Sequence, residues 1–191
     1  MQIAESSWHH ICLFGLQTLT PMKQIYTILM AVILLSAEAC KAQTINTTTV
    51  DNLDVERYMG RWYELARYDH RFERNMERCE AYYSLEPDGK IAVRNSGIDS
   101  KTGLLRITDG KAKLGKLPGQ LRVSFFLFFY SDYNILALGD NYDWALVGSS
   151  SPKYLWILSR TPSLPKPTIE HILAIARERG YDTDKLIWVQ Q

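Results

Sequence analysis

Cysteine is scarce in this sequence, and the positions of the few cysteines argue against a disulfide-stabilised domain. Only three occur among 191 residues. Cys12 and Cys40 precede the segment that we expect to fold, which leaves Cys79 without a partner. A domain of about 140 residues buries enough surface to be stable without an internal disulfide. Since His70 and His171 also lack the ligand spacing of a metal site, we expect no metal and no cofactor.

Charge of one sign is not in excess either. The chain has 22 basic and 21 acidic residues and a formal net charge of +1. Lys and Arg are scattered along the sequence, so no basic surface that could hold a phosphate backbone is predicted. We therefore expect no nucleic-acid partner. The 46% hydrophobic and 23% charged residues are typical of one globular domain.

No apolar run reaches the length of a membrane-spanning helix, which needs about 20 residues. The apolar run at 25–35 follows Met22-Lys23 and precedes small residues that continue to Ala42. This order of charge, apolar core and small residues is typical of a secretory signal peptide. We therefore predict a signal peptide at 22–42, cleaved near 39–42, and export of the protein to the periplasm or outer membrane. Residues 1–21 are interpreted as an upstream start-site artefact.

Cys40 leaves two processing routes open. Small residues before a cysteine resemble a bacterial lipoprotein site, in which a lipidated Cys40 would become the mature N-terminus and associate with the membrane. Ala37 and Glu38 depart from that pattern. Cleavage by the ordinary signal peptidase, after Ala39 or Ala42, is the alternative.

Beyond this leader, the chain alternates between short apolar segments and turns. Residues 43–57 are polar and predict a tether, and residues 58–191 predict one domain. Segments rich in β-branched and aromatic residues predict eight strands, at 61–68, 79–86, 90–98, 104–114, 120–126, 133–138, 144–149 and 154–159. Tight turns such as Pro87-Asp88-Gly89 require antiparallel neighbours.

After the eighth predicted strand the periodicity becomes helical. Thr168 is a plausible N-cap, the apolar residues from Ile169 to Ala176 share one face, and Gly180 ends the helix. Residues 186–189 predict a short ninth strand. The expected fold is all-β, an eight-stranded antiparallel up-and-down closed barrel with one C-terminal amphipathic helix packed outside. Closure is favoured because it removes exposed strand edges.

Two motifs at opposite ends of the domain carry a family resemblance. The first predicted strand begins Gly60-Arg61-Trp62-Tyr63-Glu64, and the eighth runs into Leu158-Ser159-Arg160-Thr161-Pro162. Together they resemble the first and last motifs of the lipocalin family, in which the Trp closes the barrel and the Arg packs on it. The structural residues implied are Gly60, Trp62 and Arg160. The family's middle motif is altered here at Gly139-Asp140-Asn141.

The resemblance covers about residues 51–191 and extends to the bacterial outer-membrane lipocalins and, more distantly, to apolipoprotein D. It implies binding, storage or transport of a small hydrophobic ligand, a fatty acid or lysophospholipid, in the cell envelope. Two alternatives are a lipid-processing enzyme and an interaction module whose barrel is filled by its own side chains. No nucleophile and base pattern supports the enzyme, and we predict no catalytic residues.

Strand alternation predicts which side chains face the ligand. If Trp62 points into the closed end, Glu64, Ala66 and Tyr68 follow on the same face. Phe72 is expected as a lid on the long loop after the first strand. Polar residues near the mouth would bind a carboxylate or phosphate head group. The expected ligand-contacting residues are Ala66, Tyr68, Phe72, Tyr83, Val93, Asn95, Val123, Phe125, Asn134, Leu136, Val147, Tyr154 and Trp156.

Overall fold

The computed structural model describes residues 44–191 of the chain. The expected start-site artefact at 1–21, the signal peptide at 22–42 and Cys40 lie outside the described residues. Among residues 44–191, no helix is long and apolar enough to cross a membrane. Residues 44–57, the expected tether, run along the barrel, where the Val50 amide donates to the Ile135 carbonyl at 3.0 Å.

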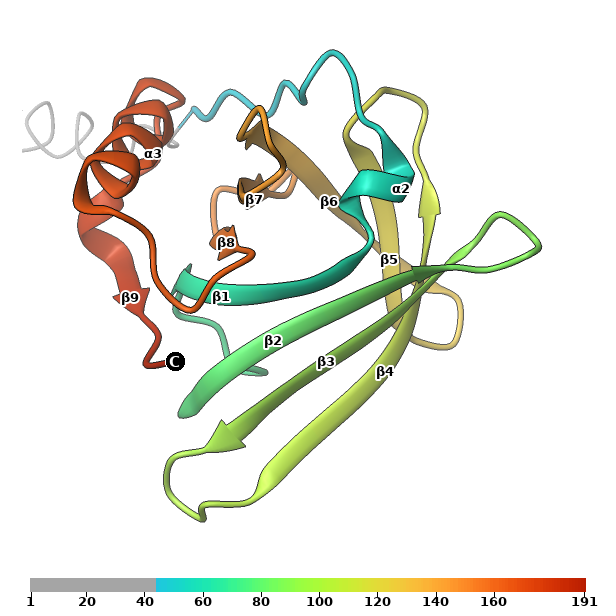
Figure 1. The fold of residues 1–191 in the computed structure, drawn as a ribbon, viewed down its shortest axis with the longest axis horizontal. Helices are drawn as coiled ribbons and strands as arrows, with labels where there is room; N and C mark the ends of the chain where they lie inside the picture. The colour runs from blue at the N-terminus through green and yellow to red at the C-terminus, as the bar shows by residue number, and fades with distance from the viewer. Residues whose placement is uncertain (1–43) are drawn as a thin grey trace, which may run out of the picture. The chain divides into compact units, whose positions relative to one another are not determined.

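The described chain forms a closed antiparallel barrel of eight consecutive strands, which confirms the predicted fold (Figure 1). From β1 to β8 each strand pairs with the next, and β8 pairs with β1, which closes the sheet. A ninth strand, β9, adds to β1 from outside. The strands are β1 (Gly60–Tyr68), β2 (Met76–Leu85), β3 (Ile91–Asp99), β4 (Leu105–Leu114), β5 (Gln120–Phe126), β6 (Phe129–Leu138), β7 (Trp144–Gly148), β8 (Leu155–Ser159) and β9 (Leu186–Trp188).

Up-and-down connectivity gives the barrel two distinct ends. The closed end carries the short helix α2 (Val55–Tyr58) and the loops at 86–90, 115–119 and 139–143. The open end carries the loops at 69–75, 100–104, 127–128 and 149–154. Because β1 starts at the closed end, Trp62 lies deep in the barrel and Tyr68 lies near its mouth.

Helix α3 (Lys166–Glu178) packs on the outside of the barrel, as predicted. It starts at Lys166, so the expected N-cap at Thr168 is wrong. Pro165 is the N-cap and Pro167 lies in the first turn, where proline is tolerated because its missing N–H has no helical partner. The helix buries Ile172 and Ala176.

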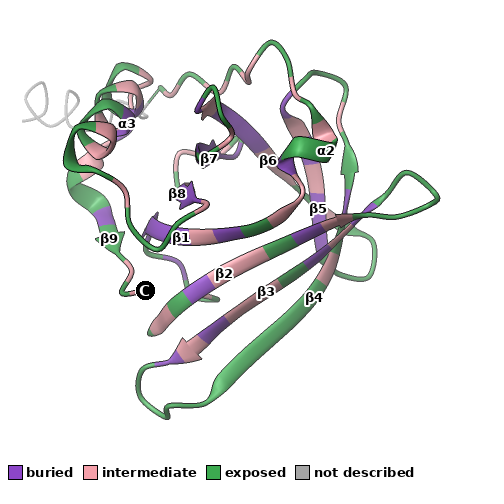
Figure 2. Ribbon diagram, viewed as in Figure 1, coloured by how far each residue is buried: buried purple, intermediate pink, exposed green. Residues whose placement is uncertain are grey.

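Two apolar clusters lie on opposite faces of the sheet. The inner cluster fills the barrel and the outer cluster lies between the sheet, α3 and β9. Burial therefore extends to both faces of the strands beneath α3, while β4 is exposed along most of its length (Figure 2). The inner cluster contains Tyr58, Trp62, Tyr83, Ile91, Val93, Ala112, Leu121, Val123, Ile135, Ala145, Val147 and Leu158. The outer cluster contains Leu65, Ala66, Tyr68, Leu136, Trp144, Leu146, Leu155, Ile157, Ile172, Ala176, Tyr181 and Leu186.

Candidate functional site

Trp62 and Arg160 meet at the closed end, as expected. The Arg160 guanidinium carbon lies 3.8 Å from the centroid of the Trp62 ring, a cation–π contact. Arg160 Nη1 also donates to the Arg61 carbonyl at 2.6 Å, and Trp62 Nε1 donates to the Tyr58 carbonyl at 2.9 Å. Gly60 has a φ of +91°, which glycine adopts without strain. These contacts form the floor of the barrel.

Three tyrosine hydroxyls fill the space above this floor. The Tyr58 and Tyr133 hydroxyl oxygens lie 2.7 Å apart, and the Tyr83 hydroxyl donates to Tyr133 at 3.2 Å. Burial raises the pKa of Tyr83 to about 12, so the cluster stays neutral and hydrogen-bonded at physiological pH. The closed half is therefore filled by the protein's own side chains. Tyr133 was missed in the sequence because it lies out of phase with the expected inward set, and Tyr58 because it lies on α2, ahead of the first strand.

A β-bulge in β1 changes the expected inward set. The pairing of β1 with β8 shifts register between Glu64 and Ala66. After this shift Ala66 and Tyr68 belong to the outer cluster, so the expectation that they face the interior is wrong. Arg67 takes the inward position instead. An extra residue in one strand reverses the alternation beyond it.

In β6, the expectation that Asn134 and Leu136 face the interior is wrong. Leu136 belongs to the outer cluster, and Asn134, two positions away, points to the same outer face. Tyr133 and Ile135 point inward instead. Because α3 covers this strand, Ile135 and Leu136 are both fully buried. When both faces of a strand are apolar, the sequence pattern does not show which face points into the barrel.

Other predicted residues do line the interior. Tyr83, Val93, Val123 and Val147 belong to the inner cluster, and Trp156 packs against it. Asn95 pairs with Ala81 across β2 and β3 and shares the inward face of Val93. These residues face the interior, and their contacts with a ligand stay predictions.

The interior becomes accessible toward the open end. Ile91 and Ile135 at the closed end are completely buried, whereas Phe125 near the mouth is 44% exposed. Gly110 pairs with Val93 on the inward face, and a Cβ on Gly110 would lie 2.5 Å from the Phe125 ring. Phe125 therefore turns inward over the Gly110 backbone, as predicted. Within residues 44–191, the buried Asn95 Oδ1 has no hydrogen-bond partner, so the interior holds an unpaired acceptor.

A charged network around the inward-facing Glu64 lies between this mouth and the floor, and the sequence did not identify its members Arg67 and Glu73. Arg67 Nη1 donates to Glu64 Oε1 at 2.7 Å, and Arg67 Nη2 donates to the carbonyls of Glu73 and Met76 at 2.6 and 3.0 Å. Arg67 thus ties the loop at 69–75 to β1. Burial, with repulsion from Glu73, raises the pKa of Glu64 to about 8. Burial also acts to raise the pKa of Glu73, but bonds from His70 and Trp156 outweigh it and lower that pKa.

The loop at 69–75 carries an aromatic stack across the mouth. The His70 ring lies 4.1 Å from Phe72 and 5.3 Å from Trp156, between centroids. Tyr154 stacks on Trp156 at 5.8 Å. Trp156 Nε1 donates to Glu73 Oε2 at 3.1 Å. Phe72, predicted as a lid, is 63% exposed and lies on this stack.

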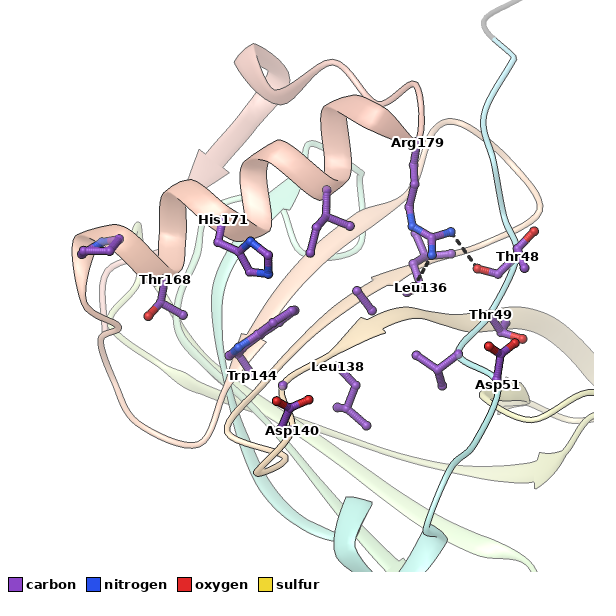
Figure 3. A pocket seen from close by; sticks show the side chains of 15 residues that line it. Thr48, Thr49, Asp51, Leu136, Leu138, Asp140, Trp144, Thr168, His171 and Arg179 are labelled. Atoms are coloured by element: carbon purple, nitrogen blue, oxygen red, sulfur yellow. Dashed lines mark hydrogen bonds between the residues drawn. The ribbon is translucent and has the colours of Figure 1, made fainter.

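A second hollow lies outside the barrel, between α3, β6 and the segment at 48–51 (Figure 3). Trp144 and His171 line it. Arg179 crosses one end and donates to the carbonyls of Thr48 and Leu136 at 2.7 and 2.6 Å. Because these bonds join secondary-structure elements, we interpret the groove as structural packing.

The side chains of Cys79, Ser124 and Ser159, which carry nucleophilic groups, are not arranged for catalysis. Burial raises the pKa of the Cys79 thiol to about 12, and a protonated thiol is a weak nucleophile. Ser124 Oγ lies 3.4 Å from two backbone carbonyl oxygens of its own turn, and Ser159 Oγ lies 3.2 Å from Thr161 Oγ1. No cluster of three or more metal-ligating side chains occurs among residues 44–191. The site is suited to binding.

Comparison with known proteins gives the same picture. The family described as Lipocalin-like domain matches residues 53–191. Outer membrane lipoprotein Blc of Escherichia coli (strain K12) is 45% identical over 80% of this chain and 89% of its own length. Apolipoprotein D of Mus musculus is 36% identical over 74% of this chain and 78% of its own. Insecticyanin of Manduca sexta superposes with a TM-score of 0.65 at 20% identity, covering 76% and 85% of the two chains, and so shares the fold.

Proposed function

The chain belongs to the lipocalin family, and from this premise we propose that it binds and carries a fatty acid or lysophospholipid in the open half of its barrel. One observation carries the proposal. The inward side chains are completely buried at the closed end but become accessible toward the mouth, where Phe125 is 44% exposed. A ligand would therefore enter from the open end and stop above the tyrosine cluster.

The lining matches an amphipathic ligand. Val93, Val123 and Val147 form an apolar wall, which suits an acyl chain, and a few convergent polar groups orient a ligand in such pockets. Asn95 Oδ1 has no partner in the part of the chain that the structure describes and would accept a hydrogen bond from a hydroxyl group of the ligand. The stack of Phe72 and Tyr154 would cover the polar head at the mouth.

Tryptophan quenching tests the location of the ligand. A brominated fatty acid quenches only tryptophans that it approaches closely. We expect quenching of the wild-type protein, most of which is lost in Trp156→Phe because Trp156 lies inside the barrel. Trp188→Phe is the matched control, since Trp188 lies on β9 outside the barrel and is 50% exposed. Equal quenching in wild type and Trp156→Phe would place the ligand elsewhere.

The natural ligand can be identified directly. Organic extraction of the protein purified from its native cells, followed by mass spectrometry, is expected to recover a fatty acid or lysophospholipid at close to one molecule per chain. A protein that yields no lipid and shows no quenching would instead be an interaction module with a filled barrel. Turnover of an added lysophospholipid would favour the lipid-processing enzyme.

We further propose that the protein acts in the bacterial envelope, anchored through Cys40. The proposal is supported by the name of the Escherichia coli relative, an outer membrane lipoprotein. Inhibition of the lipoprotein signal peptidase should leave an unprocessed precursor of higher mass. If the inhibitor leaves the mature mass unchanged, and Cys40→Ser changes it only by the mass of the substitution, the protein is cleaved by the ordinary signal peptidase.

A further inference from the structure

The hairpin between β5 and β6 ends in exposed apolar side chains. Phe126, Leu127, Phe128 and Phe129 are between 60% and 85% exposed, and the hairpin tip is coloured exposed in Figure 2. Its two loop residues, at 127–128, belong to the open end of the barrel. Single exposed apolar residues are ordinary on protein surfaces, but a group of them marks an interaction site.

The geometry of this tip opposes the usual preferences of a turn. Leu127 has a φ of +48°, a conformation that favours glycine or asparagine. The Phe126 and Phe129 rings stack across the hairpin at 6.4 Å. Apolar residues are therefore kept at a position where local conformation and solubility both favour polar ones, which indicates a role in contact with another surface.

Other apolar side chains are exposed at the same end. Leu104 and Leu105, where β4 begins, are 65% and 61% exposed, and Phe72 on the first loop is 63% exposed. We call this set the apolar rim, and it comprises Phe72, Leu104, Leu105, Phe126, Leu127, Phe128 and Phe129.

Charge distinguishes the two ends of the barrel. The loops of the open end carry four basic residues, Arg71, Arg74, Lys101 and Lys153, against two acidic ones. The closed-end loops at 86–90, 115–119, 139–143 and 160–165 carry three basic residues against four acidic ones. An apolar rim among basic side chains complements a bilayer that contains anionic phospholipids.

We propose that the apolar rim docks the open end of the barrel on an anionic phospholipid bilayer. The docked mouth faces the lipid, so an acyl chain passes between bilayer and barrel without crossing water. The transfer of an acyl chain into the barrel rests on the proposed function, whereas docking on the bilayer does not require a bound ligand.

Vesicle flotation tests docking with the full chain exported to the periplasm. Cys40→Ser removes any lipid anchor and serves as the parent protein. We expect the parent to float with vesicles of phosphatidylethanolamine and phosphatidylglycerol and to bind phosphatidylcholine vesicles more weakly. Phe128→Asp, added to the parent, should lower the partition coefficient by about tenfold or more. Leu117→Asp is the matched control, because Leu117 is 62% exposed on a closed-end loop, and it should float like the parent.

Three outcomes would overturn the proposal. The first is a parent protein that does not float. The second is a Phe128→Asp variant that floats as well as the parent. The third is a parent that is a non-floating dimer and becomes a monomer in Phe128→Asp, which would make the rim a contact between copies of this chain. Fatty-acid quenching in solution separates docking from ligand binding. If quenching persists in a parent that does not float, only docking is wrong. Flotation without quenching would contradict the proposed function and leave docking intact.

Discussion

Arg67 and Glu64 form a buried hydrogen-bonded pair inside the barrel, with Arg67 Nη1 2.7 Å from Glu64 Oε1. The two residues are three positions apart in β1, a spacing that would place them on opposite faces of a regular strand. The bulge between Glu64 and Ala66 brings them to the same face. Through its other nitrogen, Arg67 also binds two carbonyls of the loop and first residue of β2, so one side chain joins the barrel wall to its mouth.

Replacing Arg67 by Leu should destabilise the protein by about 3 kcal/mol, because Glu64 and two backbone carbonyls lose their donor in a buried site. Urea unfolding measures this change. Arg74→Leu is the matched control, since its ion pair with Asp69 is half exposed and should contribute far less to stability. Equal losses in the two variants would contradict the assignment.

The raised pKa of Glu64 predicts a pH-dependent stability. The folded pKa is about 8 against an ordinary value of 4.5, so between these values the folded state holds a proton that the unfolded state has released. Stability contributed by Glu64 is therefore complete below about pH 4.5 and lost as the pH rises toward 8. The slope is at most about 1.4 kcal/mol per pH unit. Urea unfolding from pH 5 to 8 should show this decline in wild type and a flatter profile in Glu64→Gln. A parallel decline in both proteins would assign the slope to another group.

Phe125 and Phe126 are neighbours with different expected roles. Phe125 turns inward over Gly110, whereas Phe126 belongs to the exposed apolar rim. Phe125→Ala should weaken fatty-acid binding in solution by about tenfold, since it removes an apolar contact with the ligand. Phe126→Ala should leave solution affinity within about twofold, because the Phe126 side chain is 67% exposed at the hairpin tip and does not line the interior. Fluorescence titration compares the two variants, and the reverse order of effects would place Phe126 in the site.

The sequence predicted the global fold because each element carries its own signal. Turn residues such as Pro87-Asp88-Gly89 separate the strands, and the change to helical periodicity after Pro165 marks α3. The pairing of Trp62 with Arg160 followed from two motifs that meet at one end of the barrel. The strand number, the outer helix and the floor of the barrel were therefore predictable.

The interior of the mouth was less predictable, since a bulge depends on pairing between distant segments. Nothing within the run from Glu64 to Tyr68 shows that β8 will shift its register there. Arg67 consequently replaced Tyr68 on the inward face. In β6 the cover provided by α3 made both faces apolar, and the inward phase was lost. Where one face is exposed, as along β3, alternation identified Val93 and Asn95 as inward.

Asn134 offers a direct test of this correction. Its Oδ1 is buried without a hydrogen-bond partner among the described residues, and the side chain points to the outer face below α3. Asn134→Leu replaces an unpaired polar group by an apolar one of similar size, which should raise the free energy of unfolding by about 1 kcal/mol. Because Asn134 does not face the interior, fatty-acid affinity should stay within about twofold of wild type. Urea unfolding and fluorescence titration give the two values. A large loss of affinity at unchanged stability would return Asn134 to the ligand site and contradict the register of β6 described above.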